Sequence, residues 1–263
     1  MFRMLKLKPP HGWNAVAWEL GIVTLGVIIA LAAQEWAENL SWRSKTRSAT
    51  AAITREVGDH YASSVEWRMV TPCLMAQLDR LQDRLMKSGT RLDPAPVYSE
   101  PAFPSFVLRI PSKEYDSSAW EAAMADGVAG HLDPQLRTEL SEHYQQVSAV
   151  VALTQRNGIS YGNVLTLSRP VPLDPSARLT LAQLLDELRG RVMYMDLSSG
   201  QLIDHITRAR MVPDRRLTNN TVRLSGTRLF CAEQHLPMRS LKEAETPIPY
   251  RYSPHPQATM SAS

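Results

Sequence analysis

The pattern of hydrophobic positions divides the chain into stretches of different character. Residues 20–34 contain no charged side chain, and the positions after them show helical periodicity up to a proline-rich stretch at residues 90–116. Apolar residues then recur every three or four positions until about residue 212, which is the spacing of helices that pack on one face. The pattern predicts a mainly α protein with one N-terminal transmembrane helix, a helical-bundle-like domain, a Pro-rich crossover and a disordered C-terminal tail.

The uncharged run determines the membrane prediction. A helix over residues 20–34 covers about 22 Å, which is shorter than the hydrocarbon core of about 30 Å. Extending it from Ala15 to Trp36 gives about 33 Å and places Glu19 one turn inside the edge, where a carboxylate reaches the headgroups. We therefore predict a transmembrane helix over residues 13–37.

Two sets of residues in this segment suggest how it sits in lipid. Indole rings are favoured at the membrane–water boundary, and tryptophans flank both ends of the run. The predicted interface anchors are Trp13, Trp18, Trp36 and Trp42. Small residues four apart allow two membrane helices to approach closely. The candidate association face consists of Ala17, Gly21, Gly26 and Ala30.

The same segment has two other interpretations. Its "ALAA" sequence at residues 30–33 resembles a signal-peptidase site, and an apolar run of this length also occurs as a buried helix. Residues 34–57 contain neither proline nor glycine, so they continue a helix instead of starting an independent mature protein. We favour a retained anchor, preceded by a basic tail over residues 1–12.

Charge and cysteine usage bear on topology. Three basic residues precede the span and three follow it closely, so the positive-inside count is tied, although a short basic tail favours an internal N-terminus. Cys73 and Cys231 are either two buried thiols or one long-range disulfide of an oxidising compartment. A disulfide would support the same topology, with the bulk of the chain outside the cytoplasm.

The helical domain is expected over residues 38–236, and its first helix shows two apolar faces. Thr71-Pro72 between them is typical of a helix start, so either one helix kinks at Pro72 or two helices meet there. Gly89 is a plausible stop. The two faces are Ile53, Val57, Tyr61, Val65 and Met69, and then Leu74, Leu78, Leu81 and Leu85.

Capping motifs predict three further helices. Residues 118–121 form a capping box, and residues 133–137 and 174–178 share the pattern D-P-x-x-R, in which arginine can reach back to the capping aspartate. The second of these helices is expected to stop near residues 157–158. The third is expected to break or bend at residues 198–200.

The remaining stretches show weaker patterns. Residues 105–110 are the best strand candidate of the crossover, and the apolar residues 229–231 are expected to dock on the domain. The proline-rich residues 237–263 predict a disordered tail.

The search for chemistry finds no recognised catalytic or phosphate-binding motif. Each of His60, His143 and His205 follows an acidic residue, but adjacent helix positions diverge by about 100°. We interpret these histidines as solvated, the alternative being that folding gathers them around one pocket. Surface ion pairing is likewise expected for Glu56, Asp59 and Glu66. The sequence predicts no catalytic residue, cofactor or metal, and a role other than catalysis.

Residues 18–45 resemble the start of a family of bacterial single-pass membrane proteins without an assigned activity. Members open with a helix of the type G-V-x-I-A-L-x-x-Q-x-W, which residues 26–36 match, and residues 71–81 are similar to a later Pro-Cys-Leu element. The resemblance covers about the first third of the chain. It implies a bacterial inner-membrane protein with a helical domain and transfers no functional residue.

The net charge of +3 and pI near 8.9 come from scattered arginines, which argues against nucleic-acid binding.

We expect a membrane-anchored interaction or scaffold module in the cell envelope, mainly periplasmic, whose partners are the lipid bilayer and a second copy or another membrane protein. The alternatives are an extracytoplasmic ligand-sensing domain, which would transmit a shift through the helix over residues 53–69, and an unrecognised envelope enzyme.

Overall fold

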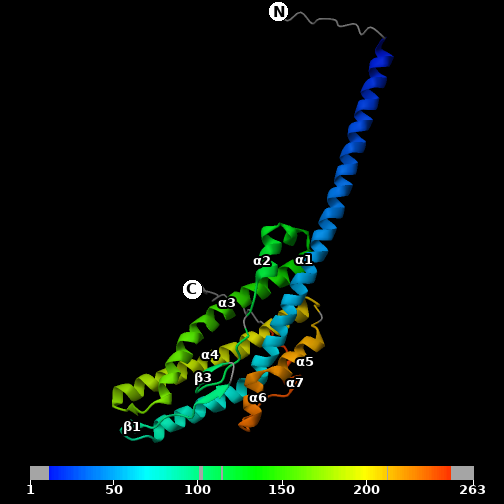
Figure 1. Ribbon diagram of the computed structural model, residues 1–263. Helices are drawn as coiled ribbons and strands as arrows, with labels where there is room; N and C mark the ends of the chain where they lie inside the picture. The colour runs from blue at the N-terminus through cyan, green and yellow to red at the C-terminus, as the bar shows by residue number, and fades with distance from the viewer. Residues whose placement is uncertain (1–11, 101–102, 114, 212, 250–263) are drawn as a thin grey trace, which may run out of the picture. The chain divides into compact units, whose positions relative to one another are not determined.

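The computed structural model describes residues 12–100, 103–113, 115–211 and 213–249. The chain divides into two units, residues 1–50 and 51–263. Helix α1 (Gly12–Lys87), drawn blue to cyan in Figure 1, contributes residues to both units. The described elements confirm the mainly helical prediction.

Helices account for most of the second unit (Figure 1). After α1, its α-helices are α2 (Ser118–Ala125), α3 (Pro134–Val164), α4 (Pro175–Arg208), α5 (Arg215–Leu224), α6 (Gly226–Glu233) and α7 (Leu241–Ala244). Two short 3₁₀ turns, η1 (Val128–His131) and η2 (Leu165–Ser168), follow α2 and α3. Two antiparallel strand pairs complete the unit: β1 (Arg91–Leu92) with β4 (Val171–Pro172), and β2 (Tyr98–Glu100) with β3 (Phe103–Phe106).

In the first unit, α1 carries its apolar side chains on the outside. By length and composition this helix can span a membrane, and none of its apolar window is buried within the protein. Trp18 and Trp36 are 73% and 68% exposed. Trp42 is half-buried and has the Lys45 ammonium 4.8 Å from its ring centroid, whereas the Trp13 side chain and residues 1–11 lie outside the described part.

The predicted association face is open in this structure. Ala17 and Ala30 are exposed, and a Cβ atom placed on Gly21 or Gly26 would meet no atom within 4 Å. The face therefore remains a prediction.

Helix α1 continues through Pro72, so the one-helix alternative is correct and Thr71-Pro72 starts no new helix. Proline has no N–H to donate to the carbonyl four residues earlier, which is that of Arg68. The guanidinium of Arg239 donates to this carbonyl at 2.9 Å, and the Arg239 backbone N–H donates to the Met69 carbonyl at 3.0 Å. A distant segment thus compensates for the backbone bond that Pro72 removes.

The core of the second unit forms between α1, α4 and the elements around them. The predicted leucine seam of α1 is buried, and it meets Leu185, Leu188 and Met195 of α4 in one apolar cluster. Cys73 of α1 and Cys231 of α6 form a disulfide with an Sγ–Sγ distance of 2.03 Å, and both residues are fully buried in this cluster. The disulfide alternative is therefore the one the structure adopts. Of the apolar residues 229–231, Phe230 and Cys231 dock on the domain as expected, whereas Leu229 is 46% exposed.

The two D-P-x-x-R motifs start helices as predicted. Asp133 accepts hydrogen bonds from the N–H groups of residues 135 and 136, and Asp174 accepts one from residue 177. The arginine of the second motif acts differently from the prediction. Arg178 does not turn back to Asp174; it donates to the carbonyls of Leu85, Ser88 and Gly89, and so caps the end of α1.

Four predicted boundaries differ from the structure. Helix α3 passes residues 157–158 and ends at Val164, and α4 continues through residues 198–200 because neighbouring elements pack around this small-residue stretch. The strand β3 covers residues 103–106, so it overlaps only the start of the predicted strand. Helix α2 begins one residue earlier than the predicted capping box requires, so the N-cap is Ser117 and not Ser118, and the Ser117 hydroxyl donates to Glu121.

Residues 237–249, which the prolines assign to the tail, pack on the second unit. The Ile248 N–H donates to the Gly200 carbonyl at 3.0 Å, and Arg239 makes two bonds to the Asp196 carboxylate. Isolated prolines do not prevent this packing, because the segment contains the short helix α7 and is held by backbone and side-chain hydrogen bonds. Residues 250–263 lie outside the described part.

Candidate functional site

The second unit contains a polar pocket beside α1. Its volume is about 500 Å³. Six of its lining residues come from one face of α1 and four from the segment before and at the start of α2. They are Ala52, Arg55, Glu56, Asp59, His60 and Ser63, then Lys113, Asp116, Ser118 and Ala119.

One lining residue of this pocket, His60, stacks on a second buried histidine, His143. His60 of α1 and His143 of α3 are each 1% exposed, with their ring centroids 5.2 Å apart. The interpretation of these histidines as solvated surface residues is therefore wrong. Burial lowers the pKa of His60. Burial lowers the pKa of His143 well below its usual value, and a positive charge on His60 or His205 would act in the same direction.

The hydrogen bonds assign the proton positions in the pair. His60 Nε2 lies 2.6 Å from the Asp116 carbonyl oxygen, which only accepts, so this nitrogen carries hydrogen. His60 Nδ1 then accepts from His143 Nε2 at 3.0 Å. His143 Nδ1 keeps a buried lone pair that has no hydrogen-bond partner in the part of the chain the structure describes. Both rings are neutral in this arrangement.

Glu56 joins three elements at the other side of the pocket. One of its carboxylate oxygens accepts from the Tyr144 hydroxyl, and the other accepts from the Ala119 N–H at 2.8 Å and the Ser118 hydroxyl at 3.3 Å. A carboxylate beside the first N–H groups of α2 is favoured by the helix dipole. Burial and the neighbouring Glu56 raise the pKa of Tyr144, whose ring stacks on that of Trp120. Glu56 is thus a buried structural acceptor and not the predicted surface ion pair.

The other two acidic residues of the predicted surface set differ from each other. Asp59 is exposed at the pocket, as expected, but among the described residues it does not form the predicted ion pair. Glu66 is 5% exposed and accepts from the Ser225 hydroxyl at 2.6 Å, and burial raises the pKa of its carboxyl.

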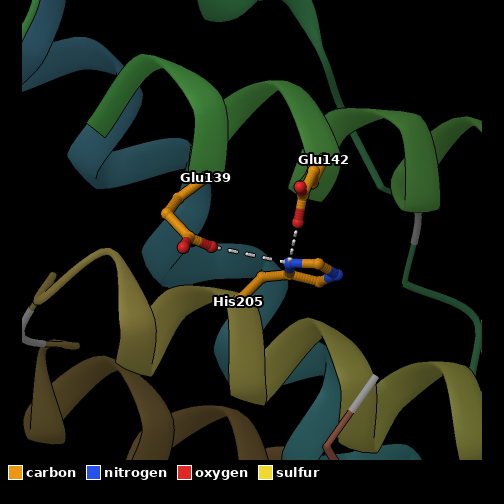
Figure 2. A group of neighbouring side chains, drawn as sticks. All are labelled: Glu139, Glu142 and His205. Atoms are coloured by element: carbon orange, nitrogen blue, oxygen red, sulfur yellow. Dashed lines mark ion pairs between the residues drawn. The ribbon is translucent and has the colours of Figure 1, made fainter. Parts of the chain in front are cut away.

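Glu139, Glu142 and His205 form a second titratable cluster, between α3 and α4 (Figure 2). Their ligand atoms lie within 4.8 Å of one another, which is a spacing that a metal ion could bridge. Arg208, however, already places its guanidinium 2.9 Å from Glu139 and 2.6 Å from Nδ1 of His205, to which it donates.

The same guanidinium also contacts Asp204 at 3.1 Å. Burial and the Arg208 charge lower the pKa of His205. An arginine thus supplies the positive charge that a cation would bring, and the donor set fits an ion-pair network between α3 and α4 better than a metal site.

A second pocket, of about 360 Å³, has mainly apolar walls. It lies between α1 and α6, where the rings of Tyr98 and Phe230 meet edge to face at 4.7 Å. Two of its charged lining residues already have partners in the protein, because Arg84 donates to two backbone carbonyls and Asp83 pairs with Lys87.

Sequence reasoning missed Glu56 and His60 as buried residues, although one signal was present. Each lies one position before a member of the apolar face, Val57 or Tyr61, and so borders that face on the helix surface. A polar residue beside an apolar face becomes buried when an additional element packs over the edge of that face. The partner His143 belongs to another helix, and no local pattern links it to His60.

Comparisons with protein-family models, curated proteins and solved structures found no match for this chain. The interpretation of the site therefore depends on its own geometry.

Proposed function

We propose that this protein is a single-pass membrane protein whose helical domain binds a small polar ligand on the extracytoplasmic side, as a sensor does. The observation that carries this proposal is that α1 holds both the exposed apolar segment and six residues of the polar pocket. A ligand in the pocket would contact the same helix that enters the lipid. This corresponds to the sensing alternative, with residues 52–63 as the part of α1 that is contacted.

The exposed apolar segment supports the membrane part of the proposal. A continuous apolar surface of this length is unfavourable in water, and soluble proteins rarely leave one uncovered. Lipid would cover it. The exposed large side chains are Val16, Trp18, Leu20, Ile22, Val23, Leu25, Val27, Ile28, Ile29, Leu31 and Trp36.

The disulfide supports the extracytoplasmic side. Bonds such as Cys73–Cys231 persist in oxidising compartments and are rare in the cytosol. Together with the resemblance of residues 18–45 to bacterial single-pass proteins, this favours the bacterial inner membrane with a periplasmic domain.

The pocket favours sensing over a purely structural scaffold. A scaffold needs an exterior contact surface, whereas this pocket is concave and lined by charged and hydroxyl side chains that small molecules recognise. The interaction-module hypothesis stays a prediction.

Ligand binding is tested by thermal unfolding of the full chain in detergent with amino acids, dicarboxylates, sugars and nucleosides. A ligand at a hundredfold excess over its Kd should raise Tm by about 5–10 °C. Ala52→Trp, which fills the pocket from its exposed rim, should abolish the shift. Ala51→Trp is the matched control, since Ala51 is exposed and does not line the pocket. A shift that survives Ala52→Trp, or no shift with any class, contradicts the proposal.

Membrane attachment and orientation are tested separately. The native protein should stay in the membrane pellet at alkaline pH, and a phosphatase fused after the domain should be active only if the domain is exported. Release into the supernatant would contradict the anchor, and an inactive fusion would contradict the orientation.

A further inference from the structure

We propose that the ligand of the α1 pocket is a compact zwitterion of the amino-acid class, whose carboxylate is bound by Arg55 and whose ammonium is bound by Asp59. This inference depends on the proposed function, because it names the ligand of the same pocket. It rests on the polar groups of the pocket that have no partner among the described residues and can therefore contact a ligand.

Several lining groups are already used by the protein. Asp116 accepts from the backbone N–H groups of residues 117 and 118 and from the Ser118 hydroxyl. Glu56 accepts three hydrogen bonds, and both nitrogens of His60 have partners. These groups shape the pocket and have little capacity left for a ligand.

The available groups form a line along α1. Arg55, Asp59 and Ser63 are four residues apart, so they follow one another at about 6 Å intervals on one face. In the part of the chain that the structure describes, Arg55 and Asp59 form no ion pair within 4.0 Å with each other or with another residue. The protein therefore presents a cation and an anion side by side without joining them.

Ser63 provides a second, independent observation. It is 2% exposed and lines the pocket, and its hydroxyl makes no hydrogen bond with the described residues. A polar ligand in the pocket would give this hydroxyl a hydrogen-bond partner in place of water.

The charge balance excludes ligands with a strong charge of one sign. The lining contains two cations, Arg55 and Lys113, and three carboxylates, Glu56, Asp59 and Asp116, which sum to −1 while His60 is neutral. A polyphosphate would face those carboxylates, and a polyamine would face the two cations. A molecule with one charge of each sign fits both, and Lys113, whose Nζ donates to Thr221 at 2.8 Å, adds positive potential for the carboxylate.

Calorimetric titration of the full chain in detergent provides the test. The twenty common L-amino acids are titrated first, and the tightest is then compared with its N-acetyl derivative, which lacks the ammonium charge, and its C-terminal amide, which lacks the carboxylate charge. Each derivative should bind about five- to tenfold more weakly.

Substitutions then assign each charge to its residue. Arg55→Gln should weaken the amino acid about five- to tenfold but leave the affinity of the amide unchanged, and Asp59→Asn should do the same with respect to the N-acetyl derivative. Arg137→Gln and Asp126→Asn are matched controls, being exposed and outside the pocket lining. Both should bind like the native protein.

The outcomes separate this inference from the proposed function. Equal affinity for the amino acid and both derivatives overturns the zwitterion assignment. Binding of a sugar or dicarboxylate that Ala52→Trp abolishes, with no amino acid bound, also overturns it but keeps the pocket as a ligand site. Binding of no polar compound overturns both.

Discussion

Two stretches of the same helix show opposite relations between polarity and burial. In residues 16–36 of α1 the large apolar side chains are exposed, whereas in residues 53–85 the helix buries His60, Ser64, Glu66 and Arg68 along with its leucines. Burial therefore follows the surroundings of each stretch and not the hydropathy of its residues. The large side chains of the first stretch pack against nothing in the described part of the chain, whereas the second stretch has hydrogen-bond partners from α3, from Ser225 before α6 and from the segment after α6.

The comparison also separates two ways of stabilising a helix. The first stretch offers only uninterrupted backbone bonds and an apolar surface, which the proposed lipid environment would cover. The second contains a proline and several buried polar groups, and it is completed by specific partners such as Arg239 and Ser225. Changes in the two stretches should therefore affect different properties of the molecule.

The largest expected effect breaks the first stretch. Leu25→Arg combined with Ile28→Arg should disfavour membrane insertion by roughly 5–7 kcal/mol, because each charge near the bilayer centre costs about 3 kcal/mol. The protein should move from the alkaline-resistant pellet to the soluble or degraded fraction. Ser41→Arg with Ser44→Arg keeps the spacing outside the span and should leave insertion intact; equal behaviour of the two double variants would refute the span.

The second largest effect concerns the domain. Replacing Cys73 and Cys231 by alanine opens a loop of 158 residues and should lower the free energy of unfolding by about 5 kcal/mol in the chain-entropy model. Urea unfolding followed by circular dichroism in detergent measures the loss. Membrane attachment should not change, and a reductant should affect only the native protein. An unchanged midpoint would mean that the bond adds nothing to domain stability.

A third prediction concerns pH. Burial lowers the pKa of His143 in the folded state below the usual 6.5, so the unfolded chain binds more protons as pH falls below 6.5. His143 should therefore remove up to about 1.4 kcal/mol of stability per pH unit in that window. His60 and His205, with lowered pKa values, should act in the same direction.

The matched test replaces His143 by glutamine, whose amide keeps a donor toward His60 and does not titrate. Denaturant unfolding between pH 7 and pH 5 should show a shallower decline for this variant. The exposed His131→Gln should decline as steeply as the native protein. A native stability that is flat between pH 7 and pH 5 would contradict the buried neutral pair.

The smallest effect tests the packing of residues 237–249. A Cβ at Gly200 would lie 2.5 Å from an Ile248 side-chain atom, so Gly200→Ala should destabilise the domain by roughly 1–2 kcal/mol. In an Ile248→Ala background the same substitution should be neutral or stabilise by up to about 1 kcal/mol, because alanine favours helix more than glycine does. Thermal unfolding of the four variants gives the comparison, and the same sign in both backgrounds would contradict this contact.

Local signals predicted the elements better than their ends. The aspartate caps of α3 and α4 and the leucine seam of α1 were readable because each depends on neighbours within a turn or two. The continuity of α1 at Pro72 could not be predicted from local sequence, since it involves Arg239, 167 positions later in the printed sequence. The D-P-x-x-R pattern also misled at Arg178, whose acceptors belong to another helix.

The candidate site was less predictable than the fold. The histidines and the acidic residues of α1 were interpreted as surface residues, because the burial of His60 and Glu56 depends on α3, α2 and the segment before α2. A polar residue beside an apolar face is compatible with either water or a buried partner. Whether such a residue is hydrated or buried depends on where the neighbouring element packs in the folded protein.

The disulfide also has a consequence for how the molecule is made. Cys73 is synthesised 158 positions before Cys231, so the leucine seam of α1 is complete long before its covalent link can form. These 263 residues contain two cysteines, and hence only one intramolecular pairing. Maturation then needs an oxidant but no isomerase to correct mispaired bonds, and the competing product is a dimer joined between two unfinished chains.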